Sequence, residues 1–309
     1  MNWDSAEIAM FIQASLDEDI GAGDLTARAI VPAEARARAK ILARRALRVA
    51  GLPLTERIFQ ALDPSASCEP QFSEGEEAPA GGVLASIECG TRALVTAERT
   101  ALNLLSHLCG VATLTREFVR AVSGTKTRIR DTRKTLPLLR QFEKYAVRMG
   151  GGENHRMGLY DAMLIKENHI AAAGSVREAL RRARAFLPSP GGHPETTAYE
   201  AFAPPRPAAW DEAVPIQIEV RNEAELREAL AAGADSVLLD NATPSEAARL
   251  VSVARGAQPG CVVELSGGVT LENVRAFAAA GADYISVGAI THSAPAADLS
   301  LLVESAARA

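Results

Sequence analysis

The sequence has little of what a disulfide-stabilised, zinc-binding or membrane-spanning protein needs. Its four cysteines, at positions 68, 89, 109 and 261, are scattered and form no Cys-x-x-Cys pair, which argues against a zinc ribbon and for a reducing compartment. The five histidines show no metal-ligand spacing, and the apolar runs are far too short to cross a bilayer. The first residues include early acids and no apolar core, so no signal peptide is evident. We therefore expect a cytoplasmic protein that has no membrane partner.

The composition is that of an ordinary globular enzyme. Apolar residues make up 48% of the 309-residue chain and charged residues 23%, which permits one large α/β domain or two smaller ones. The formal net charge of −5 argues against binding to nucleic acid, because proteins that bind it carry an excess of basic residues.

The part of the chain before residue 126 mixes helix and strand patterns. Helices are predicted over residues 6–17 and 96–108, the latter continuing after Gly110 into 113–122, and strands within 35–50 and over 83–88. In the first of these strand segments, Ala39, Ile41 and Ala43 alternate with basic residues. Such alternation is typical of strands that are buried on one face only.

From residue 126 the pattern changes to alternating strands and helices. Six strands are predicted, over residues 128–131, 162–166, 216–220, 236–240, 261–265 and 284–287. Residues 226–240 also resemble residues 274–288, at an offset of 48, and each copy combines a helix, a glycine that ends it and a buried strand. The sequence therefore predicts βα units that build a parallel sheet or barrel.

A proline-rich segment interrupts this alternation. Residues 188–215 hold seven of the sixteen prolines, and loops of this length are uncommon inside compact domains. Because the segment joins a helix to the next strand, a barrel would place it opposite the catalytic mouth. We expect a mobile or oligomer-contacting insert without a catalytic role.

Basic residues are concentrated in one stretch of this acidic chain. Residues 126–169 hold ten Lys or Arg against five Asp or Glu, whereas the whole chain holds 33 against 38. Such a local excess predicts a pocket for a multiply charged anion.

Polar residues follow the predicted strands at the point where each strand ends. They are Asp131 with Arg133 and Lys134, then Lys166, Glu219, Asp240, Ser266-Gly267-Gly268 and Gly288. Ligands of βα folds bind outside the carboxyl ends of the strands, so these residues predict a binding mouth. Arginines can hold carboxylates bidentately and lysines can hold phosphate. Carboxylates can bind Mg²⁺, and glycine N–H groups can hold a phosphate against a helix N-terminus.

Each of these residues also has an ordinary structural interpretation. A single arginine or lysine is usually a solvated surface charge, and Asp240-Asn241 could cap the helix that starts near Pro244. Ser266-Gly267-Gly268 could be only a turn, and Gly150-Gly151-Gly152 is most simply a flexible loop. Only the combined set favours the functional interpretation.

Several motifs resemble the quinolinate phosphoribosyltransferase family, the nicotinate-nucleotide pyrophosphorylases of NAD synthesis. The central motifs are residues 131–137, beginning Asp131-Thr132-Arg133-Lys134, residues 143–156 and residues 164–170. Further matches lie at residues 18–26, 98–105, 237–241, 265–268 and 285–293. The resemblance covers nearly the whole chain except the proline-rich segment.

The resemblance implies the type II phosphoribosyltransferase fold. An open-faced α/β sandwich would comprise residues 1–112 and 294–309, and an incomplete TIM-like α/β barrel residues 113–293. It further implies a homodimer or higher oligomer with shared active sites, in which Arg99 reaches into the neighbouring subunit's site.

The resemblance also assigns the site residues. Substrate would be bound by Arg99, Thr132, Arg133, Lys134, His155, Arg156, Lys166, Glu219, Asp240, Ser266, Gly267, Gly268 and Gly288. Catalysis would fall to Lys134, Lys166, Glu219 and Asp240. The two acids would also hold a Mg²⁺ that arrives with phosphoribosyl pyrophosphate, and no organic cofactor is implied. The other basic residues of 126–169 would face water, and Gln217 departs from the glutamate that the family often has.

The implied reaction transfers a phosphoribosyl group from phosphoribosyl pyrophosphate to quinolinate with decarboxylation, giving nicotinate mononucleotide, pyrophosphate and CO2. Two alternatives stay open. One is a phosphoribosyltransferase-like protein associated with molybdate transport, against which the intact Thr132-Arg133-Lys134 segment argues. The other is a non-catalytic barrel that binds a phosphorylated metabolite, which would not need both Glu219 and Asp240.

Overall fold

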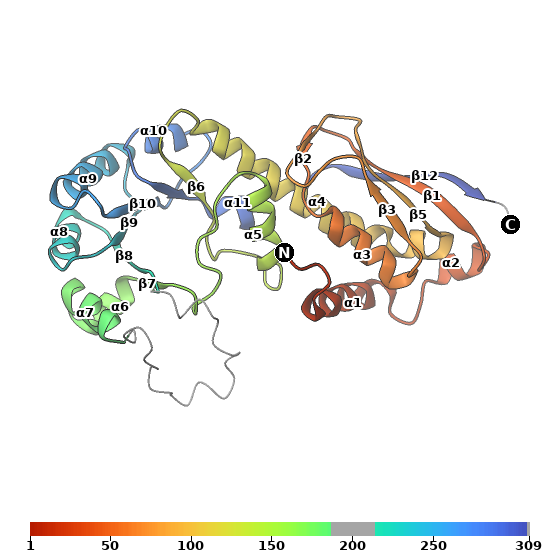
Figure 1. The fold of residues 1–309 in the computed structure, drawn as a ribbon, viewed down its shortest axis with the longest axis horizontal. Coiled ribbons are helices and arrows are strands. Elements are labelled where there is room, and N and C mark those ends of the chain that lie inside the picture. The colour runs from red at the N-terminus through yellow and green to blue at the C-terminus, as the bar shows by residue number, and fades with distance from the viewer. Residues whose placement is uncertain (187–213, 308–309) are drawn as a thin grey trace. The chain divides into compact units, whose positions relative to one another are not determined.

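The computed structural model describes residues 1–186 and 214–307. The chain divides into two compact units, and Figure 1 shows the elements of each. The first unit comprises Met1–Glu117, Thr135–Gly152 and Ala289–Ala309, and the second comprises Phe118–Lys134 and Glu153–Gly288. The predicted insert lies outside the described residues apart from its last two positions.

The predicted domain boundaries, 1–112 with 294–309 and 113–293, stay a prediction. The compact units differ from them most at Thr135–Gly152, a segment that packs with the first unit. This segment contains helix α5 (Arg140–Met149), which the strand–helix alternation did not single out.

An antiparallel sheet forms the framework of the first unit. Its strands are, in order, β12 (Leu299–Ala307), β1 (Arg36–Ala43), β5 (Val83–Gly90) and β3 (Ser67–Pro70). Along β1 the alanines and Ile41 are buried, while Arg36 and Arg38 are exposed. One face of the sheet is therefore apolar and the other faces water, which confirms the alternation predicted within residues 35–50.

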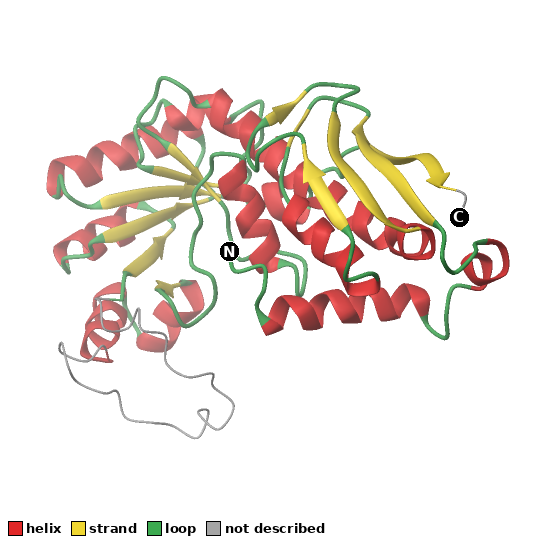
Figure 2. Cartoon of the chain, turned by 45° about the vertical axis from the view of Figure 1, so that its right-hand side comes forward, coloured by secondary structure: helices red, strands yellow, loops and turns green. Residues whose placement is uncertain are grey.

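Helices cover the apolar face of this sheet. The helices of the first unit are α1 (Ala6–Ile20), α2 (Leu25–Ile30), α3 (Leu52–Leu62), most of α4 (Thr91–Ala121), α5 and α11 (Ala289–His292), and a small sheet pairs β2 (Leu47–Arg48) with β4 (Glu77–Ala78). Helices α1, α3 and the first part of α4 lie along one face of the four-stranded sheet (Figure 2). This arrangement is an open-faced α/β sandwich.

Helix α4 runs through Gly110 without interruption, which confirms the helix predicted on both sides of that glycine. A Cβ atom at Gly110 would lie 2.1 Å from the carbonyl oxygen of Pro295. Glycine is therefore required here because another segment of the first unit approaches the helix closely.

A parallel sheet forms the second unit. Its strands are, in order, β6 (Arg128–Arg130), β11 (Tyr284–Ser286), β10 (Val262–Ser266), β9 (Ser236–Asp240), β8 (Ile216–Val220) and β7 (Met163–Ile165). All six predicted strands are confirmed, each to within two residues at either end. The first strand, β6, pairs with the last, β11, while β6 and β7 are the two edges of the described sheet. The sheet is therefore an α/β barrel that is open between its first two strands.

The connections of the second unit are helical. They are α6 (Glu167–Ala173), α7 (Val176–Phe186), α8 (Glu223–Ala231), α9 (Pro244–Ala257) and α10 (Val274–Ala278). The glycines of the two similar segments, Gly233 and Gly281, have left-handed φ angles of 76° and 81° after α8 and α10. The predicted repeat of helix, glycine and strand is thereby confirmed. Across the described part of the chain, every helix is too short or too polar to serve as a membrane span.

Candidate active site

A cavity of about 500 Å³ lies at the carboxyl ends of the parallel strands. All six strands, or the residues that directly follow them, contribute to it. Its lining consists of Thr132, Arg133, Lys134, His155, Arg156, Leu164, Lys166, Glu219, Leu238, Asp240, Asn241, Glu264, Ser266, Gly267, Gly268 and Ser286. This is the end of a parallel α/β barrel at which ligands bind.

Eleven of the thirteen predicted site residues line this cavity. The exceptions are Gly288, which directly precedes α11, and Arg99, which lies on α4 in the first unit. Arg99 lines another cavity, of about 240 Å³, together with Glu18 and Asp19. The roles predicted for Arg99 and Gly288 stay predictions.

Two arginines give one part of the cavity the character of an anion site. The Arg156 guanidinium donates from Nη1 to the carbonyl oxygen of Ala162 at 3.0 Å. Burial lowers the pKa of Arg156, and the nearby positive charge of Arg133 lowers it further. Nε of Arg133 is buried and has no hydrogen-bond partner among the described residues. A bound dianion would offset the repulsion between the two cations.

The two predicted lysines are exposed, and Lys166 also lies near an acidic group. Its Nζ is 3.9 Å from Oε2 of Glu219, and 53% of its side chain is exposed. The Lys166 backbone is fixed by the start of α6, where its N–H donates to Nδ1 of His169 at 2.9 Å. His169 therefore has a structural role at the start of this helix.

Two carboxylates from neighbouring strands form the acidic part of the cavity. Burial raises the pKa of Glu219, the negative charge of Asp240 raises it further, and Lys166 acts in the opposite direction. Helix α9 is capped by Thr243 and Glu246 rather than by Asp240. The structural alternative for Asp240 is therefore wrong, since a different residue caps that helix. Asp240 instead accepts a hydrogen bond from the Asn241 side chain at 2.6 Å.

Asp240→Asn is expected to lower the pKa of Glu219, because removing a like charge favours the ionised carboxyl group. A ¹³C NMR titration of the ligand-free protein can measure this pKa. The Glu219 carboxyl resonance is assigned by its loss in Glu219→Gln. Glu167→Gln should produce a smaller shift in the same direction, since Glu167 contributes less than Asp240. An unchanged Glu219 pKa in Asp240→Asn would contradict the electrostatic coupling of the pair.

The carboxylate pair fits a metal that is carried in by a substrate. Within residues 1–186 and 214–307, no group of three or more His, Cys, Asp or Glu side chains is arranged to hold a metal ion. Mg²⁺ commonly binds through one or two carboxylates together with substrate phosphates and water. Glu219 and Asp240 supply that number of protein ligands.

The glycine loop after β10 is fixed against the loop after β9. Gly267 and Gly268 have φ angles of 93° and 63°, and the Asn241 N–H donates to the carbonyl oxygen of Ser266 at 2.9 Å. A Cβ atom at Gly267 would lie 2.1 Å from Oδ1 and 2.9 Å from the backbone nitrogen of Asn241. Helix α10 begins only at Val274, so the N–H groups of this loop are not at a helix N-terminus, contrary to the prediction.

Gly267→Ala is expected to destabilise the second unit more than Gly268→Ala does. Both substitutions force a left-handed backbone on alanine, at about 1–2 kcal/mol each. Only the first also collides with Asn241, since nothing lies within 4 Å of a Cβ atom at Gly268. The collision should remove about 1–3 kcal/mol more from the free energy of unfolding in urea. If both variants lose the same free energy of unfolding, the loop after β10 can move away from the loop after β9 without cost.

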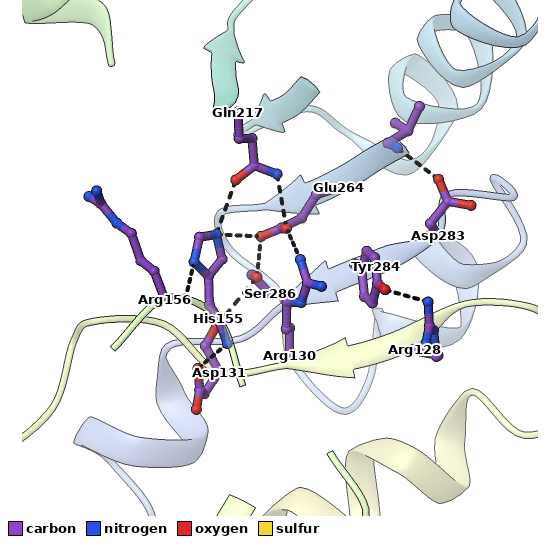
Figure 3. A network of polar contacts seen from close by, with 11 residues as sticks. Arg128, Arg130, Asp131, His155, Arg156, Gln217, Glu264, Asp283, Tyr284 and Ser286 are labelled. Atoms are coloured by element: carbon purple, nitrogen blue, oxygen red, sulfur yellow. Dashed lines mark hydrogen bonds and ion pairs between the residues drawn. The ribbon is translucent and has the colours of Figure 1, made fainter. Parts of the chain in front are cut away.

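A buried carboxylate, Glu264 on β10, lines the cavity, and Figure 3 shows the polar groups that surround it. Its Oε2 accepts hydrogen bonds from Arg130 Nη1 and Gln217 Nε2, both at 3.0 Å, and its Oε1 accepts one from Ser286. The predicted list of site residues did not include Glu264. The signal that could have found it is a charged residue inside the otherwise apolar run 261–265.

The expectation that the remaining basic residues face water is wrong for two of them. Arg130 binds Glu264, and its guanidinium lies 3.5 Å from the ring centroid of Tyr284. Lys144 in the first unit is only 2% exposed. Gly150-Gly151-Gly152 forms a turn after α5, and this turn is closely packed, because a Cβ atom at Gly150 would lie 2.5 Å from a backbone oxygen.

Asp131 fixes the segment that carries His155 and Arg156. The Asp131 carboxylate is fully buried, and it accepts hydrogen bonds from the His155 N–H at 2.7 Å and the Asn154 side chain at 2.6 Å. Glu153 forms a parallel bridge with Arg130 beside β6. Asp131 is therefore a structural anchor for one wall of the cavity.

The fold and the cavity together define a class of protein. It is an α/β-barrel protein with an open-faced sandwich, and its cavity combines cations, paired carboxylates and a glycine loop, as a site for an anionic sugar phosphate requires. The family model for the quinolinate phosphoribosyl transferase N-terminal domain matches residues 24–109, and the model for the C-terminal domain matches residues 111–202 and 200–302. The chain belongs to the quinolinate phosphoribosyl transferase family.

Individual relatives agree with this assignment. The chain is 40% identical over 284 residues to the probable nicotinate-nucleotide pyrophosphorylase [carboxylating] of Bacillus subtilis (strain 168), covering 92% of this chain and 89% of that protein. It is 38% identical to the nicotinate-nucleotide pyrophosphorylase [carboxylating] of Mycobacterium leprae, covering 94% and 95%. The solved nicotinate-nucleotide pyrophosphorylase of Francisella tularensis superposes with a TM-score of 0.84 at 36% identity, covering 96% of each chain. These similarities confirm the predicted fold.

Proposed function

We propose that this protein is a nicotinate-nucleotide pyrophosphorylase (carboxylating) of NAD biosynthesis. It transfers the phosphoribosyl group of phosphoribosyl pyrophosphate to quinolinate and releases CO2, pyrophosphate and nicotinate mononucleotide. The observation that carries the proposal is the separation of charge inside one cavity. Arg133 and Arg156 provide a paired cationic site, while Glu219 and Asp240 provide a paired anionic site.

The cations suit the two anionic substrates. Quinolinate is a planar dicarboxylate, and guanidinium groups bind carboxylates through two parallel hydrogen bonds. We assign Arg133 and Arg156 to this substrate. Lys134 and Lys166 carry compact charges that suit the pyrophosphate group. Ser266, Gly267 and Gly268 are assigned to the 5′-phosphate, for which the loop supplies backbone N–H groups.

The transfer step requires no covalent enzyme intermediate. The ring nitrogen of quinolinate forms a bond to C1 of the ribose, and the bond between C1 and pyrophosphate breaks. Positive charge develops on the ribose as the leaving group departs, and the nearby Glu219 and Asp240 stabilise it. The lysines neutralise the departing pyrophosphate. Glu219 and Asp240 would hold a Mg²⁺ ion that arrives with the substrate, and the ion would supply further neutralisation of the leaving group's charge.

Decarboxylation follows from the charge of the product of this transfer. The ring nitrogen of the adduct is a cationic pyridinium, which accepts the electron pair that remains when the 2-carboxylate leaves as CO2. A proton from water then replaces the carboxylate at that carbon. The cavity favours this loss to the extent that it removes water from the carboxylate.

We further infer a homodimer with shared sites and a cytoplasmic location. The resemblance of residues 98–105 to the family supports the first, because it matches Arg99 to an arginine that reaches into the neighbouring subunit's site. The free thiols of all four cysteines support the second, since a reducing compartment maintains them.

Arg99→Ala and Lys166→Ala, each inactive alone, should regain activity when mixed under conditions of subunit exchange. A dimer that carries both changes retains one unaltered site if Arg99 acts in the neighbouring subunit. Statistical mixing yields half heterodimers, so about a quarter of wild-type activity is expected per total protein. The assay is turnover after mixing, with mixed dimers verified by differential tagging. No recovery in verified heterodimers would place Arg99 in its own subunit's site.

The reaction itself is tested by incubating the protein with quinolinate, phosphoribosyl pyrophosphate and Mg²⁺ and measuring nicotinate mononucleotide. Product formation is expected, and Arg148→Ala serves as a matched control because Arg148 is exposed and does not line the cavity. Absence of product across the pH range, despite binding of phosphoribosyl pyrophosphate, would favour the non-catalytic alternative.

A further inference from the structure

The two ring nitrogens of His155 are both engaged inside the protein. Nδ1 lies 2.7 Å from the backbone nitrogen of Arg156, which donates its N–H to it. A nitrogen that accepts a hydrogen bond carries no proton, so the ring proton must be on Nε2. Nε2 lies 3.0 Å from Oε1 of Gln217. The geometry therefore corresponds to a neutral imidazole with the proton on Nε2.

The amide of Gln217 is oriented by its other partner. Its Nε2 donates to Oε2 of Glu264 at 3.0 Å, so its Oε1 must face the histidine (Figure 3). If the proton of His155 were on Nδ1, two acceptors would face each other at this contact. Gln217 is only 7% exposed and Glu264 is fully buried, so water does not compensate for a mismatched pair. The amide thus selects one tautomer of the ring.

The carboxylate of Glu264 acts against the neutral ring of His155. Oε1 of Glu264 is 3.6 Å from Nε2 of His155, and a carboxylate at this distance favours a protonated imidazole. That carboxylate is already bound by Arg130 from β6 and by Ser286 from β11. Two further charged residues adjoin His155, namely Asp131, which accepts a hydrogen bond from its backbone N–H, and Arg156, which follows it in the chain. The pairing with Arg130 offsets the charge of Glu264.

We propose that Gln217 is a positioning residue that holds His155 in the neutral Nε2–H tautomer, so that His155 fixes the Arg156 backbone and adds no charge to the cavity. The cations that substrates meet are then Arg133, Lys134, Arg156 and Lys166. Gln217 suits this role because its amide donates to a carboxylate and accepts from an imidazole at the same time. A glutamate at this position could not donate to Glu264 unless it were protonated.

The tautomer can be measured directly by ¹⁵N NMR of protein labelled at histidine, without ligand, between pH 6.5 and 8. The His155 resonances, assigned by their loss in His155→Gln, should show one protonated Nε2 and one unprotonated Nδ1 throughout. A ring that is doubly protonated at pH 7, or protonated on Nδ1, would overturn the proposal. The tautomer itself is measured in the wild-type protein, and the measurement requires no catalytic activity.

Gln217→Met tests the role of the amide, because methionine has a similar length and forms neither hydrogen bond. His155 should then become a mixture of states, with a larger protonated fraction at pH 6.5, because the uncharged acceptor of the Nε2 proton is lost while the carboxylate of Glu264 remains 3.6 Å away. Gln13→Met, at an exposed glutamine of the first unit, is the matched control and should leave the His155 spectrum unchanged. An unchanged spectrum in Gln217→Met would show that the amide does not select the tautomer.

A second measurement tests whether His155 adds charge to the cavity. It rests on the anion site of the proposed function, but it does not require turnover. Sulfate, which does not titrate in this range, is the probe, and its affinity is measured by calorimetry. Its dissociation constant should be independent of pH in the wild-type protein. In Gln217→Met, sulfate should bind at least about threefold more tightly at pH 6.5 than at pH 8. If sulfate also binds the wild-type protein more tightly at pH 6.5 than at pH 8, the result would contradict a neutral His155.

Discussion

Arg133→Ala is expected to raise the dissociation constant for quinolinate by about 30- to 5,000-fold. This range corresponds to the ~2–5 kcal/mol that is lost when one partner of a desolvated charge pair is removed. Arg133 is half-buried in the cavity wall, and its charge is close enough to Arg156 to lower the pKa of that residue. Without Arg133, one carboxylate of a planar dicarboxylate lacks its partner. Binding is measured by calorimetry with the ligand-free enzyme.

Two matched variants separate geometry from charge at this position. Arg133→Lys keeps the charge but loses the planar pair of donors, so it should recover only part of the affinity. Arg148→Ala removes an arginine of α5 that does not line the cavity. The dissociation constant for quinolinate should then change by no more than a factor of about two. If Arg133→Ala binds quinolinate as tightly as the wild-type protein does, Arg133 does not contact this substrate.

Glu219→Gln is expected to lower kcat by about 10²–10³-fold, the loss that follows removal of one preorganised group facing transition-state charge. Glutamine keeps the size of the side chain but not its negative charge, so the positive charge that develops on the ribose loses a partner. Because that charge exists mainly in the transition state, kcat should fall more than the affinity for phosphoribosyl pyrophosphate. Single-turnover rates at saturating substrate measure the effect on chemistry directly.

Glu223→Gln provides the control for this change. Glu223 is at the start of α8 and forms ion pairs with Arg227 and Arg249 outside the cavity. Its loss should leave kcat within a factor of about two, since exposed ion pairs contribute little. A Glu219→Gln enzyme that retains full kcat would remove Glu219 from the transfer step.

The strands and the mouth of the barrel could be predicted from the sequence because they depend on local patterns. Most strands of the second unit are short and mainly apolar, and the last residue of each strand is polar or is followed by a polar one. In a parallel sheet the carboxyl ends lie on one side, so residues such as Lys166, Glu219 and Asp240 are brought together by topology alone. Position along each strand was sufficient to find them.

The polar network around Glu264 could not be predicted in the same way. Glu264, Gln217 and Arg130 lie within strands, and their meeting depends on the order and register of strands that are distant in the sequence. The sequence shows that Glu264 is an unusual residue in an apolar run, but not which cation satisfies it. Helix α5 was not singled out for a related reason, because Glu143 and Lys144 on it are polar and yet buried. Their tertiary partners outweigh the hydrophobic pattern.

The four-stranded and the six-stranded sheet are both completed by strands from the last part of the chain. β11 provides the partner of β6 across a separation of 156 residues, and β12, over Leu299–Ala307, provides a partner of β1. A ribosome that adds about 5–20 residues per second needs roughly 8–30 s to extend the chain from β6 to β11. During that time β6 has no strand to pair with among those described. Neither unit can assemble its full sheet during early synthesis, so the nascent chain must keep exposed strand edges from associating until its final segments emerge.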